Sequence, residues 1–191
     1  MSVSATSWLA PELFKKEFQK YKEIYLENNS DADLVMSYIL LQLFIENHFH
    51  YYLRFMIGGG FKSGVIATGW KEMDYPDGKL VCLEVFLKKN NFVFTSALLA
   101  KIKDNYKRIT NIRNALAHGH EVTTTFDSVK KDSKAKGFLN RQKFNQTCLL
   151  ANEIADAWNA LLIELQEQKE LLESSGSPTP HFLDYCKIKV F

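Results

Sequence analysis

The chain has 191 residues, of which 46% are hydrophobic, enough for a sizeable core without disulfide bonds. Its 24 basic and 22 acidic residues give a net charge of +2, so bulk charge does not indicate nucleic-acid binding, and any such site has to be a local patch. Three widely spaced cysteines, Cys82, Cys148 and Cys186, form neither a metal-binding pair nor a disulfide framework. Together with a start that lacks the features of a signal peptide, they predict a cytoplasmic protein.

The first two predicted elements are helices. Residues 11–28 alternate apolar and charged side chains with helical spacing. Residues 31–56 carry a wide apolar band, which Ser30 or Asp31 can cap at its start, and the glycines at 58–60 end it. The apolar part of this second helix is too short to span a bilayer, so we expect a buried helix and no membrane association.

The middle of the chain is less regular. Glycines and prolines predict a loop insertion around residues 57–78. Residues 80–87 are almost entirely apolar, and this pattern fits either a buried helix or a strand. A strong helical pattern then covers 95–118, with Gly119 as its C-terminal stop. The polar, lysine-rich residues 121–137 that follow indicate a loop.

The last long helix is predicted over residues 139–172, and a Ser/Pro linker and a short, largely apolar tail follow it. No strand pattern persists along the chain. We therefore expect an all-α bundle of four to five helices, with one domain over residues 1–173 and a linker and C-terminal tail over 174–191.

A short motif at the end of the helix over 95–118 combines a permanent cation with a titratable base. Arg113 can hold a phosphate through two parallel hydrogen bonds, and His118 can give or take a proton near neutral pH. Asn114 and His118 share one helix face because they are four residues apart, whereas Arg113 lies about 100° to one side of Asn114. The alternative is that Arg113 is a solvated surface cation and His118 a C-terminal cap.

The Arg113-Asn114-x-x-x-His118 spacing resembles the signature of the HEPN superfamily, helical bundles named from nucleotide-binding proteins of higher eukaryotes and prokaryotes. The Ala117-His118-Gly119 ending is similar to several of its prokaryotic branches. This resemblance implies a metal-independent endoribonuclease, often a toxin or an antiviral defence factor. His120 stands where some branches have a tyrosine, so no family role is carried over to it, and it is kept only as a candidate supporting residue.

The resemblance also implies a mechanism and an assembly. The 2′-hydroxyl of RNA attacks the neighbouring phosphorus, and the products are a 2′,3′-cyclic phosphate and a 5′-hydroxyl. Arg113 would stabilise charge on the phosphorane, His118 would be the acid or the base, and Asn114 would orient His118 or the phosphate. One histidine cannot act as acid and base at the same instant, so a homodimer whose two motifs meet is expected.

Other polar residues are weaker candidates for the same site. Glu46 and Asn47 interrupt an apolar helix and could orient the motif, or they could form a polar helix edge that faces solvent or a partner. Lys107 and Arg108, on the helix that carries the motif, are candidates for binding RNA phosphates.

No cofactor and no metal are expected. His118, His120 and His181 could hold a metal only in principle, because no carboxylate or cysteine spacing supports such a site.

A different class of function fits the same pattern. The chain could be a non-catalytic helical-bundle module in which Arg113 and His118 bind a nucleotide without breaking bonds. In that case the apolar tail, residues 181–191, could dock on a protein partner or on a dimer mate. Under both hypotheses an antitoxin or another protein is a candidate partner.

Overall fold

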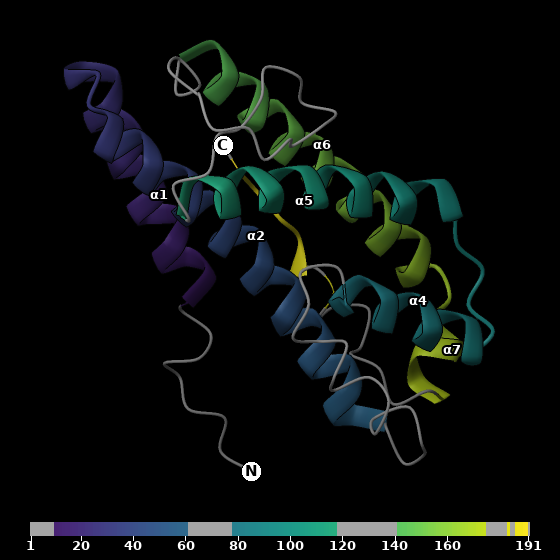
Figure 1. Ribbon diagram of the computed structural model, residues 1–191. Coiled ribbons are helices and arrows are strands. Elements are labelled where there is room, and N and C mark those ends of the chain that lie inside the picture. Colours follow the sequence, from purple (N-terminus) through teal and green to yellow (C-terminus); the bar gives the residue numbers. More distant parts are fainter. Residues whose placement is uncertain (1–9, 61–77, 118–140, 175–182, 184–185, 191) are drawn as a thin grey trace. The chain divides into compact units, whose positions relative to one another are not determined.

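The computed structural model describes residues 10–60, 78–117, 141–174, 183 and 186–190 (Figure 1); of residues 10, 50–60 and 115–117 it describes the backbone alone. Every long regular element in these ranges is a helix, which confirms the predicted all-α class. The helices are α1 (Ala10–Asn28), α2 (Asp31–Gly60), α4 (Gly78–Lys89), α5 (Ser96–Ala117), α6 (Arg141–Gln166) and α7 (Lys169–Ser174). None of these six helices combines the length and the hydropathy needed to cross a membrane.

The chain divides into two compact units. Unit 1 comprises Met1–Asn47 and Asn105–Asn152, and unit 2 comprises His48–Asp104 and Glu153–Phe191. The long helices α2, α5 and α6 therefore each contribute one segment to both units. Each unit is described separately below.

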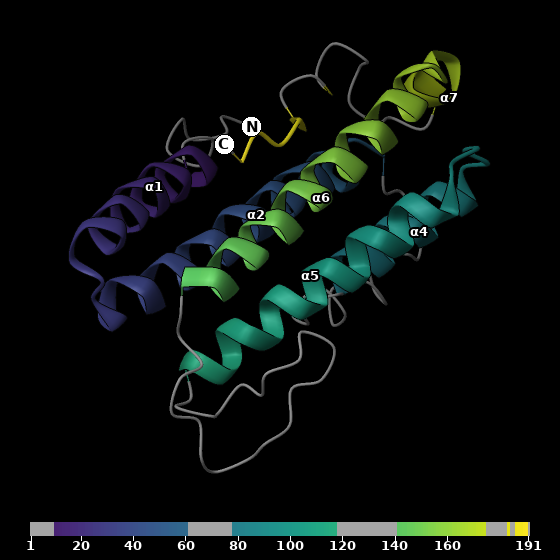
Figure 2. The ribbon, with the colours of Figure 1, turned by 90° about the horizontal axis from the view of Figure 1, so that it is seen from above.

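Unit 1 is built around one aromatic side chain of α6. In this unit α1 runs alongside the first half of α2, and the start of α6 packs against both (Figures 1 and 2). The ring of Phe144 lies 6.3 Å from that of Phe18, 5.8 Å from that of Tyr25 and 5.3 Å from that of Tyr38. All four side chains are buried, so they join the three helical segments. Aromatic contacts of this kind contribute more to stability than the burial of their apolar area alone.

A two-residue turn joins α1 to α2. Asn29 has φ 53°, the left-handed conformation that commonly ends a helix, and its N–H donates to the carbonyl of Tyr25 at 2.8 Å. The N–H of Leu34 donates to the carbonyl of Ser30 at 3.1 Å, so Ser30 is the residue that begins the α2 hydrogen-bond ladder. The turn thus confirms that the helical pattern breaks between residues 28 and 31.

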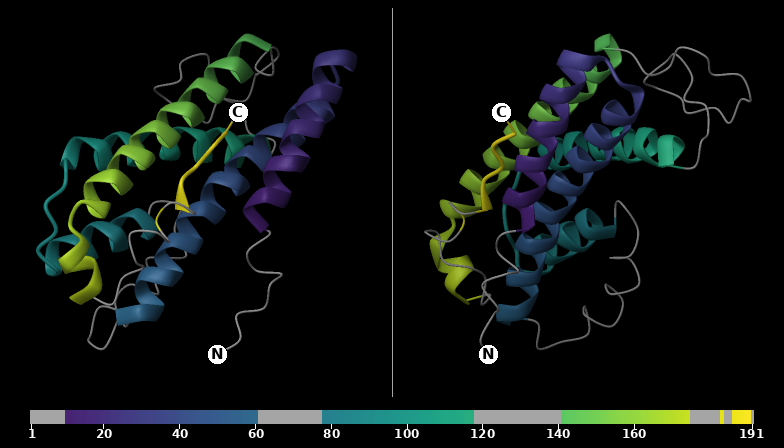
Figure 3. Two further views of the ribbon diagram at one scale, coloured as in Figure 1. Left: turned by 180° about the vertical axis from the view of Figure 1, so that it is seen from behind. Right: turned by 90° about the vertical axis from the view of Figure 1, so that its left-hand side faces the viewer.

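In unit 2, the C-terminal residues 186–190 run beside α6 (Figure 3). The indole N–H of Trp158 donates to the carbonyl of Cys186 at 3.0 Å. The amide of Asn159 makes two bonds to Ile188, donating to its carbonyl and accepting from its N–H, both at 2.9 Å. Cys186, Ile188 and Val190 are buried and the residues between them are not, which is the alternation of an extended segment with one face inward. These tail residues are therefore buried within their own chain.

The predicted continuous helix over 139–172 is wrong, because it is interrupted between α6 and α7. The interruption coincides with Gln168, whose side-chain amide accepts from the N–H of Val93 at 2.8 Å and donates to the carbonyl of Val93 at 2.6 Å. The carbonyl of Gln168 then accepts from the N–H of Leu172 at 3.1 Å, which begins α7. A contact with a residue far away in the sequence thus accompanies a break that helical periodicity does not reveal.

The two ends of the loop insertion predicted around 57–78 are helical in the structure. Residues 57–60 belong to α2, Gly78 begins α4, and residues 61–77 lie outside the described residues. The alternatives left open for 80–87 are resolved, because this segment is part of helix α4. The polar loop predicted over 121–137 and the stop at Gly119 also fall outside the described ranges.

Candidate functional site

The first half of the predicted motif lies near the end of α5. Arg113 and Asn114 are both half-buried, and the helix ends three residues later at Ala117. His118, the second half of the motif, and His120 lie outside the described residues.

Arg113 shares one face of α5 with two buried polar residues. Tyr106, Thr110 and Arg113 fall within a sector of about 60° around the helix axis, because they are spaced at four and then three residues. Tyr106 is 0% exposed and Thr110 is 2% exposed. A buried hydroxyl normally needs a hydrogen-bond partner, so this face of α5 has to contact polar groups, which a purely apolar face would not.

Gln42 links this face of α5 to α2. Its side-chain Nε2 donates to Glu46 Oε2 at 2.5 Å and to the hydroxyl of Tyr106 at 3.2 Å. An ionised carboxylate can only accept, so the NH₂ end of the amide must face Glu46 and the orientation of the Gln42 side chain is determined. One fully buried amide thus holds a carboxylate of α2 and a phenol of α5 within unit 1.

Two opposite charges act on the phenol of Tyr106. Its pKa is raised, chiefly by burial and then by the negative charge of Glu46, while the hydrogen bonds with Gln42 and Thr110 and the positive charge of Arg113 act in the opposite direction. Glu46 and Arg113 therefore both lie close enough to influence the same hydroxyl. With its pKa raised, Tyr106 stays protonated at neutral pH, which excludes it as a general base.

Two buried polar atoms in this part of unit 1, Oε1 of Gln42 and Nε of Arg113, make no hydrogen bond with the described residues. Arg113 also forms no ion pair with any described carboxylate, although the guanidinium group is a permanent cation. The charge of Arg113 is therefore not neutralised by a direct bond within the described part of the chain.

The structure separates the remaining candidates. Lys107 is exposed and lies within about 20° of Asn114 around α5, whereas the exposed Arg108 lies about 120° from Asn114. Asn47 donates its side-chain amide to the carbonyl of Leu43 in its own helix at 2.7 Å. Of the two candidates on α2, only Glu46 is therefore seen to act on the face that carries Arg113.

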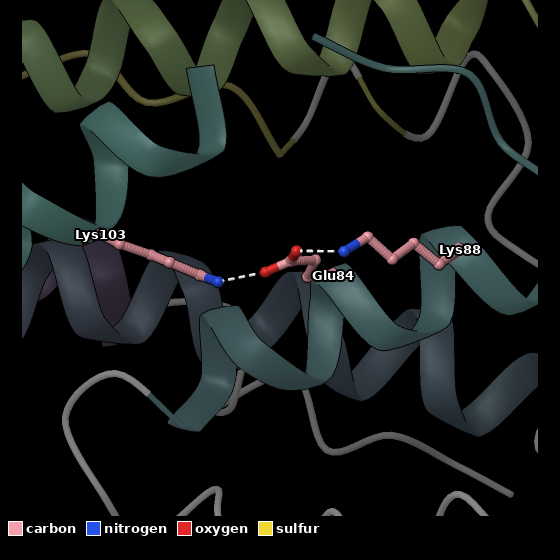
Figure 4. Close-up of polar contacts among 3 residues, drawn as sticks. All are labelled: Glu84, Lys88 and Lys103. Carbon is pink, nitrogen blue, oxygen red and sulfur yellow. Dashed lines mark hydrogen bonds and ion pairs between the residues drawn. The ribbon is translucent and has the colours of Figure 1, made fainter. Parts of the chain in front are cut away.

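The lysines in the first half of α5 differ from Arg113 because carboxylates balance their charge. Glu84 of α4 bonds both Lys103 of α5 and Lys88 of α4, the latter at 2.6 Å (Figure 4). These bonds, led by the one from Lys103, hold the pKa of the Glu84 carboxyl below its usual value. Lys101 lies 3.4 Å from a carboxylate oxygen of Glu153. These ion pairs therefore all lie within unit 2.

Within the described ranges, no three His, Cys, Asp or Glu side chains cluster so that they could hold a metal ion. Comparisons of the chain with protein-family models, with curated proteins and with solved structures gave no match. What the site can do is therefore argued from its own residues.

Sequence reasoning missed Gln42, Tyr106 and Thr110. Tyr106 occupies an apolar position in the pattern of α5, and Gln42 looks like a mere interruption of the apolar run in α2. The available signal was the spacing, since Gln42 and Glu46 are one turn apart, as are Tyr106 and Thr110.

Proposed function

We propose that this protein is a metal-independent endoribonuclease of the HEPN type in which Arg113 binds the scissile phosphate. The observation that carries the proposal is the state of Arg113. It is half-buried near the end of α5, close enough to Tyr106 for its charge to act on the phenol, and it has no ion pair with a described residue. An arginine held in this way is suited to bind a phosphate, because the planar arrangement of its N–H donors matches the arrangement of the phosphate oxygens.

The proposed reaction needs a nucleophile, an acid and a base. RNA supplies the nucleophile, because the 2′-hydroxyl attacks the adjacent phosphorus once a base has taken its proton. The bond from phosphorus to the 5′-oxygen then breaks, and an acid protonates the departing oxygen. Arg113 stabilises the negative charge that develops on the phosphoryl oxygens, and Asn114 orients the phosphate or His118. Tyr106 is not the base in this scheme, because its raised pKa keeps the phenol protonated.

His118 supplies one of the two proton-transfer groups, and a second copy of the chain supplies the other. A homodimer that brings two motifs together provides two imidazoles and two guanidinium groups for one cleft, and an isologous interface presents the same residues twice. In a cell the protein would act in the cytoplasm as a toxin or an antiviral effector. An antitoxin is then the expected partner protein.

The test is RNA cleavage by the purified full chain in the presence of EDTA. We expect cleavage by the wild type at an unchanged rate in EDTA, a loss of about 100-fold for Arg113→Ala, which is typical of removing a charge-stabilising donor, and no cleavage by His118→Ala. Arg141→Ala is the matched control, because this arginine is exposed at the start of α6 and should leave the rate unchanged.

Two outcomes contradict the proposal. If chelation abolishes cleavage, the chemistry depends on a metal. If the wild type binds RNA or a nucleotide but does not cleave RNA, the chain is a binding module. Expression in a bacterial host separates the two functions independently, because a ribonuclease toxin arrests growth and its His118→Ala variant does not.

A further inference from the structure

The C-terminal segment, residues 186–190, occupies a defined part of α6 within unit 2 (Figure 3). Its inward side chains, Cys186, Ile188 and Val190, are buried. Trp158 donates to the carbonyl of Cys186, and the side-chain amide of Asn159 both donates to the carbonyl of Ile188 and accepts from its N–H. We call the part of α6 that makes these bonds, Trp158 and Asn159, the tail site.

The tail site binds the main chain of the segment and every second side chain. A primary amide can donate to a carbonyl and accept from an N–H at the same time, which is how Asn159 holds Ile188. Main-chain hydrogen bonds give affinity for an extended segment, and the burial of alternate side chains gives specificity. The same segment from a second copy of the chain carries the same groups in the same order, so it is able to make the same contacts.

The segment can leave the tail site without unfolding the helix that carries it. Helix α6 is continuous over Arg141–Gln166, and its own main-chain hydrogen bonds do not depend on residues 186–190. Three hydrogen bonds and three inward side chains have to offset the conformational freedom that five residues lose. These opposing contributions are of similar size, so we expect docking to be reversible.

We propose that the tail site also binds the C-terminal segment of a second copy of the chain, so that two copies are joined by exchange of residues 186–190. Exchange replaces each contact within one molecule by an identical contact between two molecules, which is a known route to dimers. Within one molecule the segment has an effective concentration on the order of 1 mM, so exchange is favoured at high protein concentration or when the internal contact is damaged. The site lies in unit 2, and the exchange does not depend on the proposed cleavage of RNA.

The test is complementation between two variants of the full chain. Asn159→Ala damages the tail site and keeps the segment, whereas Ile188→Asp places a charge at a buried position of the segment and keeps the site. Asn159→Ala is isotope-labelled, and modification of its Cys186 by a thiol reagent is followed by mass spectrometry. This modification should be roughly 30-fold faster than in the wild type. Adding Ile188→Asp at about 0.1 mM should slow it again roughly fourfold, because the intact site then competes about threefold better than the damaged internal site.

Unlabelled wild-type protein is the matched control, because its own segment occupies its tail site. At the same concentration it should leave the modification of Cys186 in Asn159→Ala unchanged. Equal rates with and without Ile188→Asp overturn the proposal, and so does equal slowing by the wild type, since the protection would then not come from an empty tail site. If Ile188→Asp does not fold, Val190→Asp damages the segment at another buried position. A protein that fails to cleave RNA would leave these results unchanged, because none of the measurements uses RNA.

Discussion

The two hydrogen bonds between Asn159 and Ile188 give a quantitative prediction about the C-terminal segment. Asn159→Ala removes both bonds, which measure 2.9 Å each, and leaves the peptide groups of Ile188 without these partners. At about 1 kcal/mol net for each bond, docking of residues 186–190 should weaken by about 2 kcal/mol, and the undocked population should rise roughly 30-fold.

Cys186 reports on this undocking directly. Burial raises the pKa of its thiol to about 12, so the docked cysteine is shielded and almost entirely protonated. Labelling by a thiol reagent at pH 8 should then occur from the undocked state, at a rate proportional to its population when redocking is fast. Mass spectrometry should find Cys186 labelled roughly 30-fold faster in Asn159→Ala than in the wild type. Cys148, in unit 1, serves as the internal reference. The control is Asn145→Ala, which changes an exposed asparagine of α6 in unit 1. If the rate for Cys186 in Asn159→Ala does not rise above that in this control, the tail is not held by these bonds.

Three further predictions concern stability. Glu84→Gln should lower the free energy of unfolding by about 1 kcal/mol at pH 7. Because the pKa of Glu84 is lowered in the folded state, this contribution is present above the unfolded value near 4.5 and is lost as the pH falls through the folded value. The difference between wild type and variant in urea unfolding should therefore disappear in acid, and a difference that persists there contradicts this assignment. Lys103→Met should cost more than Lys88→Met, since their side chains are 25% and 65% exposed, and equal losses would show that burial does not matter here. Tyr106→Phe should cost about 1 kcal/mol in the same assay, because Gln42 loses a buried acceptor, whereas an unchanged unfolding midpoint would mean that this bond contributes nothing.

Local periodicity was sufficient to predict most of the helices but could not locate every end. The amphipathic patterns of α1, α2 and α5 were clear because each of these helices buries one stripe. For α4 the pattern was ambiguous, because apolar residues occur on most sides of this helix. A short apolar run of this kind has the same sequence pattern in a buried helix and in a buried strand. The break between α6 and α7 was missed because Gln168 bonds Val93, a residue 75 positions away in the sequence.

In the candidate site too, some residues could be found from local sequence and others only from contacts between helices. Arg113 and Asn114 could be selected from the sequence because their spacing to His118 resembles a known family motif. Tyr106 could not, because a buried phenol occupies the same kind of position as leucine and its hydroxyl becomes informative only when a partner is known. That partner, Gln42, comes from a different helix. The link from Glu46 through Gln42 to the face of Arg113 is therefore a property of tertiary structure.

The most direct measurement of the central claim is the chemistry of the RNA ends that the purified protein produces in EDTA. The account predicts fragments that end in a 2′,3′-cyclic phosphate and begin with a 5′-hydroxyl. It predicts that Arg113→Ala forms them about 100-fold more slowly, and that none form from RNA with a 2′-deoxy nucleotide at the cleavage position. Fragments with 5′-phosphate and 3′-hydroxyl ends, or cleavage that persists at a 2′-deoxy position, would contradict attack by the 2′-hydroxyl and the role assigned to Arg113.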